Sequence, residues 1–372
     1  MNRMIGRTCL AAVTALSLAV MTACAGDAGA DDQTRRAGSA TLTGAGATFA
    51  MPLISLWSPE YQQATGNRVN YNSIGSGGGI RAHIDRTVHF AASEAPLNAE
   101  QTERAAGTLT IPFTIGTVTL AYNLPGVDEL RLTGEVLADI YLGRTRRWND
   151  PRIAELNPNA DLPDRGIVVA HRSDGSGTTY VFTDYLSKMS ERWREDVGYA
   201  TSVSWPTGIG GNGNEGVAGA IRNSPGAIGY IELSYASSLG LPVAAIRNRE
   251  GNFVKPSLEG ATAAAAGAIE ALPAAHEVWT DVSFTDAPGA TSYPISSFSY
   301  FFVYEDLSRL GDQVDEQTAR QIVDWLHWAV TDGQEMNAQV NNARIPDGVR
   351  DRNVEGLRRI NFRGERLLDG RR

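Results

Sequence analysis

The stretch from Ile167 to Leu186, IVVAHRSDGSGTTYVFTDYL, decides the fold class of this 372-residue chain. Its first four residues are apolar and predict a buried strand, which ends at Arg172. A glycine-rich turn, 173–178, follows the strand and leads into a helix, where apolar residues recur at helical spacing as far as Trp193. A strand, a tight turn and a helix in this order are typical of α/β proteins.

The N-terminal part of the chain shows the same order of elements twice. A short strand at 41–42 precedes a predicted tight loop at 44–48 and a helix with apolar residues at helical spacing. A second strand near residue 70 precedes a second tight loop at 75–79 and a short helix at 80–86. These patterns predict an α/β fold with a largely parallel sheet.

Three glycine-rich turns share one design, because each carries a hydroxyl side chain and leads into a helix. They are Gly46–Phe49, Gly75–Gly78 and Gly175–Thr178. A helix start has unpaired backbone N–H groups and a partial positive charge, and glycine lets a ligand approach the backbone closely. Several such starts, together with the guanidinium of Arg172 at the end of a strand, would form a cage of donors for an oxyanion.

Six motifs, three of which contain these turns, resemble the periplasmic phosphate-binding proteins of Pst-type ABC transporters. The resemblance runs from about Thr41 to the last helix and keeps the order of the motifs. The motifs are AGATF (45–49), IGSGGGI (74–80), TVHFAASEAPL (87–97), IYLGRTRRWNDPRI (140–153), HRSDGSGTTYVFTDYL (171–186) and GAIGYIE (226–232).

The resemblance implies a two-lobe, type II periplasmic-binding-protein fold. Each lobe would be a mixed, mostly parallel sheet flanked by helices, and the ligand would bind in the cleft between the lobes. We expect lobe one to consist of residues 39–115 and 293–372, and lobe two of residues 116–292. The chain would cross between the lobes at 112–116 and 292–294, because turns from both halves of the chain have to reach one cleft.

The resemblance also assigns residues to the phosphate site. Asp174 matches a carboxylate that orients the arginine, and Glu94 stands where the family has an aspartate that accepts the proton of phosphate. Glu94 would therefore separate phosphate from sulfate, unless it points to solvent and takes no part in binding. The predicted phosphate-binding residues are Thr48, Phe49, Ser76, Glu94, Arg172, Ser176, Gly177 and Thr178.

The N-terminus has the pattern of an export signal. Arg3 and Arg7 precede an apolar stretch at 9–21, and MTAC at 21–24 resembles a bacterial lipobox. We expect residues 1–23 to be a lipoprotein signal peptide, Cys24 to receive lipid, and residues 24–38 to form a flexible tether. The protein would then be extracytoplasmic, in the periplasm or on the outer face of the cell membrane. The alternative is an ordinary secretory signal that contains Cys24 by chance.

Charge and motifs exclude several other classes of function. The net charge of −9 argues against a nucleic-acid partner. The five histidines lack metal-ligand spacing, and no Gly-x-Ser-x-Gly elbow surrounds Ser76 or Ser176, so we expect no cofactor, no metal and no enzyme activity. Gly208–Gly213 matches a dinucleotide fingerprint, but Trp205-Pro206 precedes it, so a loop near the cleft leading into a helix at 215–222 is the preferred interpretation.

The expected partners follow from the resemblance. They are inorganic phosphate and the permease and ATPase of an ABC transporter, with contact to the membrane only through the N-terminal lipid and with the protein as a monomer. Two alternatives stay open at this point: a secreted phosphate-ester hydrolase with a similar anion cage, and a receptor for a related oxyanion such as arsenate or a phosphonate. A hydrolase needs an activated nucleophile or metals, and the motifs supply neither.

Overall fold

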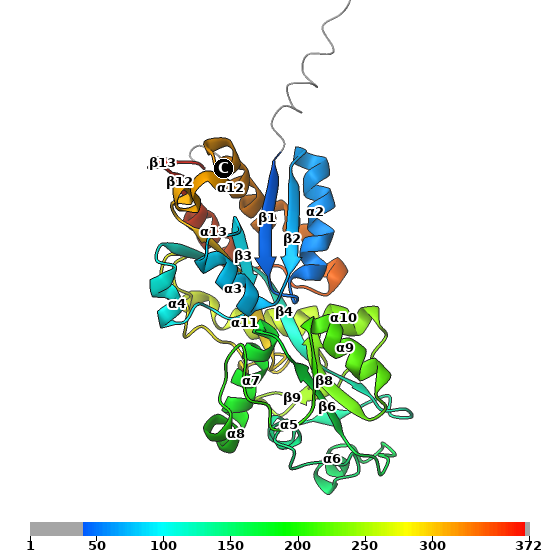
Figure 1. Ribbon diagram of the computed structural model, residues 1–372. Coiled ribbons are helices and arrows are strands. Elements are labelled where there is room, and N and C mark those ends of the chain that lie inside the picture. Colours follow the sequence, from blue (N-terminus) through cyan, green and yellow to red (C-terminus); the bar gives the residue numbers. More distant parts are fainter. Residues whose placement is uncertain (1–39, 369–372) are drawn as a thin grey trace, which may run out of the picture. The chain divides into compact units, whose positions relative to one another are not determined.

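The computed structural model describes residues 40–368 (Figure 1). The predicted signal peptide, the lipid-accepting Cys24 and the tether therefore lie outside the described residues. The described residues belong to one compact unit, Ser39–Arg372. Within residues 40–368, no helix is long and apolar enough to cross a membrane.

One eight-stranded mixed sheet runs through this unit in the order β2-β1-β3-β11-β4-β8-β6-β7. At one end β1 pairs in parallel with β2 and β3, and at the other end β6 pairs in parallel with β7 and β8. The two central strands, β11 and β4, run antiparallel to their neighbours. The strands are β1 (Thr41–Gly46), β2 (Arg68–Ser73), β3 (Phe90–Ser93), β4 (Thr108–Asn123), β6 (Val168–Arg172), β7 (Ile209–Gly211), β8 (Ala227–Glu232) and β11 (Ser296–Tyr304).

Strand β4 is 16 residues long and changes its partner along its length. Residues up to Thr117 pair with β11, and residues from Val118 onward pair with β8. The strand therefore connects the two parallel groups of the sheet. The expected lobe boundary at residues 115/116 stays a prediction, and the change of partner two residues later supports it.

Helices flank both groups of strands (Figure 1). Gly66 ends the first helix in a left-handed conformation, as a C-terminal glycine typically does. The helices are α2 (Met51–Thr65), α3 (Ser76–Ile84), α4 (Ala99–Arg104), α5 (Gly134–Tyr141), α6 (Pro151–Leu156), α7 (Gly177–Met189), α8 (Glu191–Asp196), α9 (Gly213–Asn223), α10 (Leu233–Ser238), α11 (Leu258–Ala266), α12 (Glu316–Val330) and α13 (Asp347–Leu357).

Short elements complete the fold. A three-stranded sheet has the order β10-β9-β5, and β12 pairs with β13 in a hairpin. These strands are β5 (Arg131–Leu132), β9 (Ala245–Arg247), β10 (Phe253–Val254), β12 (Asn361–Phe362) and β13 (Glu365–Arg366), and the 3₁₀ helices are η1 (Ile269–Ala271), η2 (Leu307–Gln313) and η3 (Asp332–Val340).

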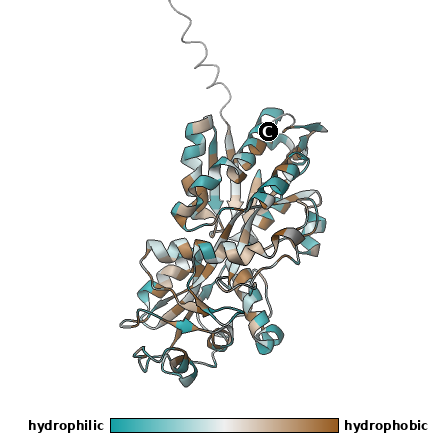
Figure 2. Cartoon of the chain, turned by 180° about the vertical axis from the view of Figure 1, so that it is seen from behind, coloured by the Kyte–Doolittle hydropathy of each residue, from teal (hydrophilic) through white to brown (hydrophobic). Residues whose placement is uncertain are grey.

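Buried aromatic side chains pack on both parts of the sheet. Near β11, the rings of Phe113 and Phe301 stack with centroids 3.8 Å apart. Near β8, the rings of Phe182 and Tyr230 stack at 4.5 Å. Such pairs add to the stabilisation from buried apolar area, and hydrophilic residues concentrate on the outer helices and loops (Figure 2). The cores hold the loops at the strand ends in place.

The structure confirms the two-lobe α/β fold class with a mixed sheet, in which β11 and β4 are the antiparallel strands. It corrects two details of the predicted loops. The predicted loop at 44–48 is wrong for its first half, since β1 continues to Gly46. Gly44 serves close packing there, because a Cβ would lie 2.3 Å from Cζ of Phe90. The predicted loop at 208–213 contains β7, and the next helix begins at Gly213, two residues early.

Candidate functional site

Two of the predicted glycine-rich turns contact each other at the candidate site. The turn before α3 contacts the turn before α7, where the backbone N–H of Gly77 donates to the carbonyl of Gly175 at 3.0 Å. Gly75 has φ 76°, a conformation that glycine adopts without strain. A Cβ on Gly177 would lie 2.6 Å from Oγ of Ser76, so only glycine allows this close approach. The N-terminal ends of α3 and α7 therefore lie together.

Arg172 is buried at the end of β6 with an exposed fraction of 3%. Its Nε donates to Oδ1 of Asp174 at 2.7 Å, and its Nη2 forms an ion pair with Oδ2. The backbone N–H of Gly213 also donates to Oδ1 at 3.1 Å. Burial pushes the pKa of Asp174 up, but hydrogen bonds and the charge of Arg172 outweigh it and lower the pKa below its ordinary value. The ion pair therefore persists at neutral pH.

Glu94 follows β3 and is 1% exposed, so the alternative that it points to solvent is wrong. Ser299 in β11 donates to its Oε1 at 3.0 Å, and Ser76 at the start of α3 donates to its Oε2 at 3.1 Å. Burial raises the pKa of Glu94 to about 7, although these hydrogen bonds and the charge of Arg172 act to lower it. The carboxyl therefore exchanges its proton near neutral pH.

The first glycine-rich turn contributes Thr48 and Phe49, both buried. The carbonyl of Thr48 accepts a hydrogen bond from the hydroxyl of Tyr235 at 2.7 Å. Phe49 packs against Gly116, where a Cβ would lie 2.4 Å from Cε1 of the ring. The side chain of Phe49 thus packs the turn against β4, so any ligand contact of this residue would have to use its backbone N–H.

Ser176 and Thr178 are fully buried at the start of α7. Oγ of Ser176 caps the helix by accepting from the backbone N–H of Thr179 at 3.0 Å. Oγ1 of Thr178 accepts from Nη1 of Arg172 at 3.4 Å. The hydroxyl hydrogen of Ser176 is not needed for the cap, so it remains available to donate to a ligand.

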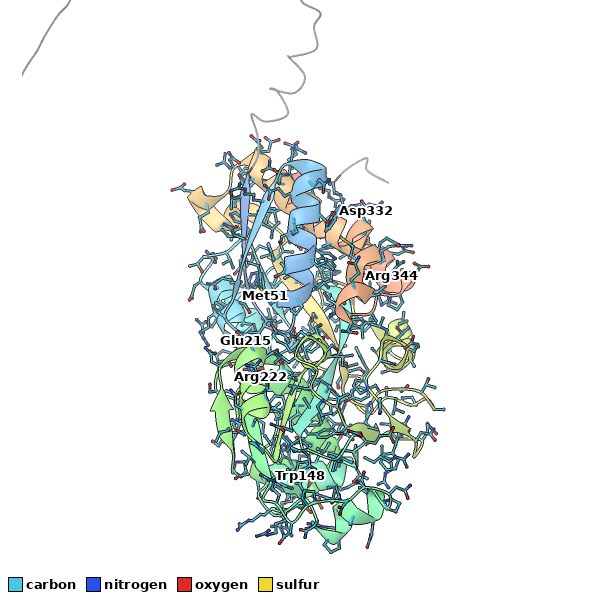
Figure 3. The ribbon with its side chains drawn as sticks, turned by 90° about the vertical axis from the view of Figure 1, so that its right-hand side faces the viewer. Met51, Trp148, Glu215, Arg222, Asp332 and Arg344 are labelled. Carbon is cyan, nitrogen blue, oxygen red and sulfur yellow. The ribbon has the colours of Figure 1, made fainter. Side chains whose placement is uncertain are left out.

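Two buried polar residues of the site escaped the sequence analysis. Asn214, in the first turn of α9, donates through Nδ2 to Oγ1 of Thr48 at 2.8 Å and to Oγ1 of Thr178 at 3.2 Å. Glu232, at the end of β8, is 0% exposed, and burial raises its pKa to about 8. Figure 3 shows Met51, at the start of α2, above Glu215, which follows Asn214 in α9. The glycine-rich segment before α9 also leads into a helix, although it lacks the hydroxyl side chain of the other three turns, and it was the signal for Asn214.

The structure thus brings all of the predicted phosphate-binding residues to one place between the ends of the strands. One set of contacts joins Ser76, Glu94 and Gly177, and another joins Thr48 through Asn214 to Thr178 and Arg172. Within residues 40–368, no three His, Cys, Asp or Glu side chains gather into a potential metal site. The donors around the site suit an anion with several oxygen atoms.

Three comparisons with known proteins identify the family and the fold of the chain. Residues 31–332 match a family model described as a PBP superfamily domain. The phosphate-binding protein PstS of Pasteurella multocida is 42% identical over 311 residues, which cover 83% of this chain and 87% of the relative. The phosphate-binding protein PstS of Methanocaldococcus jannaschii is 38% identical over 305 residues, which cover 78% of each chain.

Solved structures show the same fold. A high-affinity periplasmic phosphate-binding protein, PfluDING, has a TM-score of 0.67 at 19% identity, with 84% of this chain and 92% of that chain covered. A phosphate ABC transporter substrate-binding protein from Clostridium perfringens has a TM-score of 0.59 at 17% identity, with 82% and 100% covered. The predicted family and fold are therefore confirmed, and the chain belongs to the PstS family of phosphate-binding proteins within the PBP superfamily.

Proposed function

We propose that the chain binds inorganic phosphate between its two lobes and delivers it to the permease of an ABC importer. The observation that carries this proposal is the convergence of hydroxyl groups, helix starts and Arg172 around one buried place in a PstS-family fold. The PstS relatives are named as phosphate-binding proteins, and the Clostridium perfringens neighbour as a transporter component. Both names support a transport role.

The proposed contacts divide into a charge and a set of neutral donors. Arg172 is the cation of the site, and Asp174 holds its guanidinium in one orientation. Thr48, Ser176 and Thr178 supply hydroxyl donors, and Phe49 and Gly177 supply backbone N–H groups. The hydroxyl of Ser76 donates to Glu94 and would have to turn toward phosphate to act as a further donor. Because most donors are neutral and fixed by the backbone, an anion can bind in a protein whose net charge is −9.

Glu94 gives this donor cage a carboxylate acceptor in the proposed site. Near neutral pH, phosphate carries at least one proton and can donate a hydrogen bond to that carboxylate, whereas sulfate carries none. Sulfate would place lone pairs and negative charge against Glu94, and a buried mismatch of this kind costs several kcal/mol. We therefore infer that Glu94 selects phosphate over sulfate. Arsenate, which resembles phosphate in shape and protonation, should still bind.

Calorimetric titration with phosphate, sulfate and arsenate tests this function directly. We expect tight binding of phosphate, weaker binding of arsenate and little binding of sulfate. The purified protein should also gain melting temperature with phosphate, because a ligand that binds only the folded state stabilises it. No heat of binding and no shift in melting temperature with phosphate would overturn the proposal.

The absence of enzyme activity is part of the same proposal. The relatives are named as binding proteins, and the site offers donors for an anion without a cluster of metal ligands in residues 40–368. A chromogenic phosphate ester should therefore not be turned over. Hydrolysis of that ester, lost in Arg172→Ala, would instead favour the hydrolase alternative.

We also propose that Cys24 anchors the protein by lipid on the outer face of a membrane after removal of residues 1–23. The lipobox pattern at 21–24 and the family's role outside the cytoplasm support this. Cys24→Ser should move the protein to the soluble fraction and leave phosphate affinity unchanged. A variant that stays with the membranes would contradict the anchor. Size-exclusion chromatography of the soluble variant would test the expected monomer.

A further inference from the structure

Asn214 contacts both threonines of the site from the first turn of α9. It is fully buried. Its backbone N–H donates to Oγ1 of Thr48 at 3.1 Å, and its Nδ2 donates to the same oxygen at 2.8 Å. Nδ2 also donates to Oγ1 of Thr178 at 3.2 Å. One amide therefore connects hydroxyl groups from two turns that are far apart in the sequence.

The backbone of β8 fixes which end of this amide faces the threonines. The backbone N–H of Glu232 lies 3.0 Å from Oδ1 of Asn214. Because an N–H group can only donate, Oδ1 has to face Glu232 and Nδ2 has to face the threonines. The NH₂ group has two hydrogens, one for each threonine. All side-chain hydrogen-bonding groups of Asn214 are thereby assigned.

These bonds leave each threonine hydroxyl with only its hydrogen to offer. A hydroxyl group has one hydrogen and two lone pairs. Oγ1 of Thr48 accepts both bonds from Asn214. Oγ1 of Thr178 accepts one bond from Asn214 and one from Nη1 of Arg172 at 3.4 Å. Both oxygens are therefore occupied as acceptors.

We propose that Asn214 is a positioning residue that turns the hydroxyls of Thr48 and Thr178 into donors toward the bound oxyanion. The inference rests on the proposed phosphate site and adds the residue that sets its polarity. With both hydroxyls committed as donors, Glu94 is left as the acceptor for the proton of phosphate. Preorganised donors bind an anion better than freely rotating ones, because no reorientation is needed on binding.

Asn214→Asp replaces the donor that faces the two threonines by an acceptor and gives the sharpest test. A carboxylate has no hydrogen to donate, so the threonine hydroxyls would turn toward it and away from phosphate. At pH 8 we expect phosphate affinity, measured by calorimetry, to fall at least about a hundredfold, with partial recovery toward pH 6 as phosphate and the new carboxyl take up protons. A fold defect alone would not recover in this way.

Asn212→Asp is the matched control. Asn212 is exposed, lies two residues away and makes no side-chain bond at the helix start. The substitution Asn212→Asp adds the same charge to the same loop. Phosphate affinity should therefore change by no more than about threefold, as expected for a screened surface charge. Equal losses in Asn214→Asp and Asn212→Asp would overturn the inference.

A double-mutant cycle with Asn214→Ala and Thr48→Val tests whether Asn214 acts through the hydroxyl. If it does, the double variant should lose less affinity than the product of the two single losses, since the second change removes a group already without its partner. Independent, multiplicative losses would reject the inference. Failure of the wild-type protein to bind phosphate would reject the proposed function instead, so the two failures are distinguishable.

Discussion

Arg172 and Glu94, a cation and a carboxyl on the two sides of the site, are held by different kinds of partner. Arg172 pairs with the carboxylate of Asp174, whose pKa is lowered despite its burial. The carboxyl of Glu94 accepts side-chain hydrogen bonds from the hydroxyls of Ser76 and Ser299, and burial raises its pKa to about 7. A directly paired opposite charge offsets the free-energy cost of burying a carboxylate, whereas two neutral hydroxyl donors do not. The arginine side therefore has a fixed charge, and the glutamate side has an adjustable one.

This difference assigns the two sides different tasks. A fixed cation with two or more donor atoms attracts any small oxyanion, phosphate and sulfate alike. A carboxyl whose proton exchanges near neutral pH responds to whether the anion carries a proton. We therefore expect changes on the arginine side to affect affinity, and changes on the glutamate side to affect selectivity and pH dependence.

Among changes to the arginine and glutamate sides, Arg172→Ala should have the largest effect. A hydrogen bond to a charged group contributes about 1.5–3 kcal/mol. Loss of the guanidinium should therefore weaken phosphate binding at least about tenfold to a hundredfold in a calorimetric titration. Arg172→Lys should not restore binding, because an ammonium cannot reproduce the planar fork. Affinity like that of the wild type in Arg172→Ala would remove Arg172 from the site.

Glu94→Gln should change the choice between anions more than the affinity for phosphate. The amide keeps nearly the same size, loses the charge and gains a donor. We expect phosphate affinity to fall modestly and sulfate binding to appear or strengthen. Titrations of the variant with both anions measure this. If the preference for phosphate over sulfate is unchanged, Glu94 is not the discriminating acceptor.

The buried carboxyl of Glu94 should also make stability fall with rising pH. Burial raises its pKa from the ordinary 4.5 to about 7, so the folded state binds more protons than the unfolded state between these pH values. The free energy of unfolding without phosphate should therefore decrease as pH rises from about 4.5 to about 7. Urea unfolding at several pH values should show a smaller decrease in Glu94→Gln. Some decrease should remain, because the pKa of Glu232 is raised to about 8.

The smallest effect should come from Ser299→Ala. The hydroxyl of Ser299 donates to Oε1 of Glu94 and helps to lower its pKa. Loss of one such bond should raise that pKa by roughly half to one unit. The pH dependence of stability should shift upward by that amount while Arg172 and its partners are unaffected. An unchanged pH profile would show that Ser299 does not tune the carboxyl.

Local sequence patterns were sufficient to predict the elements that hold Arg172. Arg172 and Asp174 are two residues apart at the end of a strand, and the glycine-rich turn after them leads directly into α7. Strand, turn and helix depend on residues close in sequence, so periodicity and glycine placement predict them. The fold class followed for the same reason. The loop at 44–48 was predicted incorrectly because the sequence does not distinguish a glycine that packs against a side chain, as Gly44 does against Phe90, from a glycine in a turn.

The sequence by itself therefore determined the α/β fold class, the family and the residues of the glycine-rich turns. Only the tertiary structure decided the environment of Glu94 and the contacts of Asn214. Ser299 reaches Glu94 across 205 residues, and Asn214 reaches Thr48 across 166. The first contact depends on β11 lying beside β3, with Tyr300 opposite Ser93. Strand order and register arise from packing among distant segments, which local periodicity does not encode.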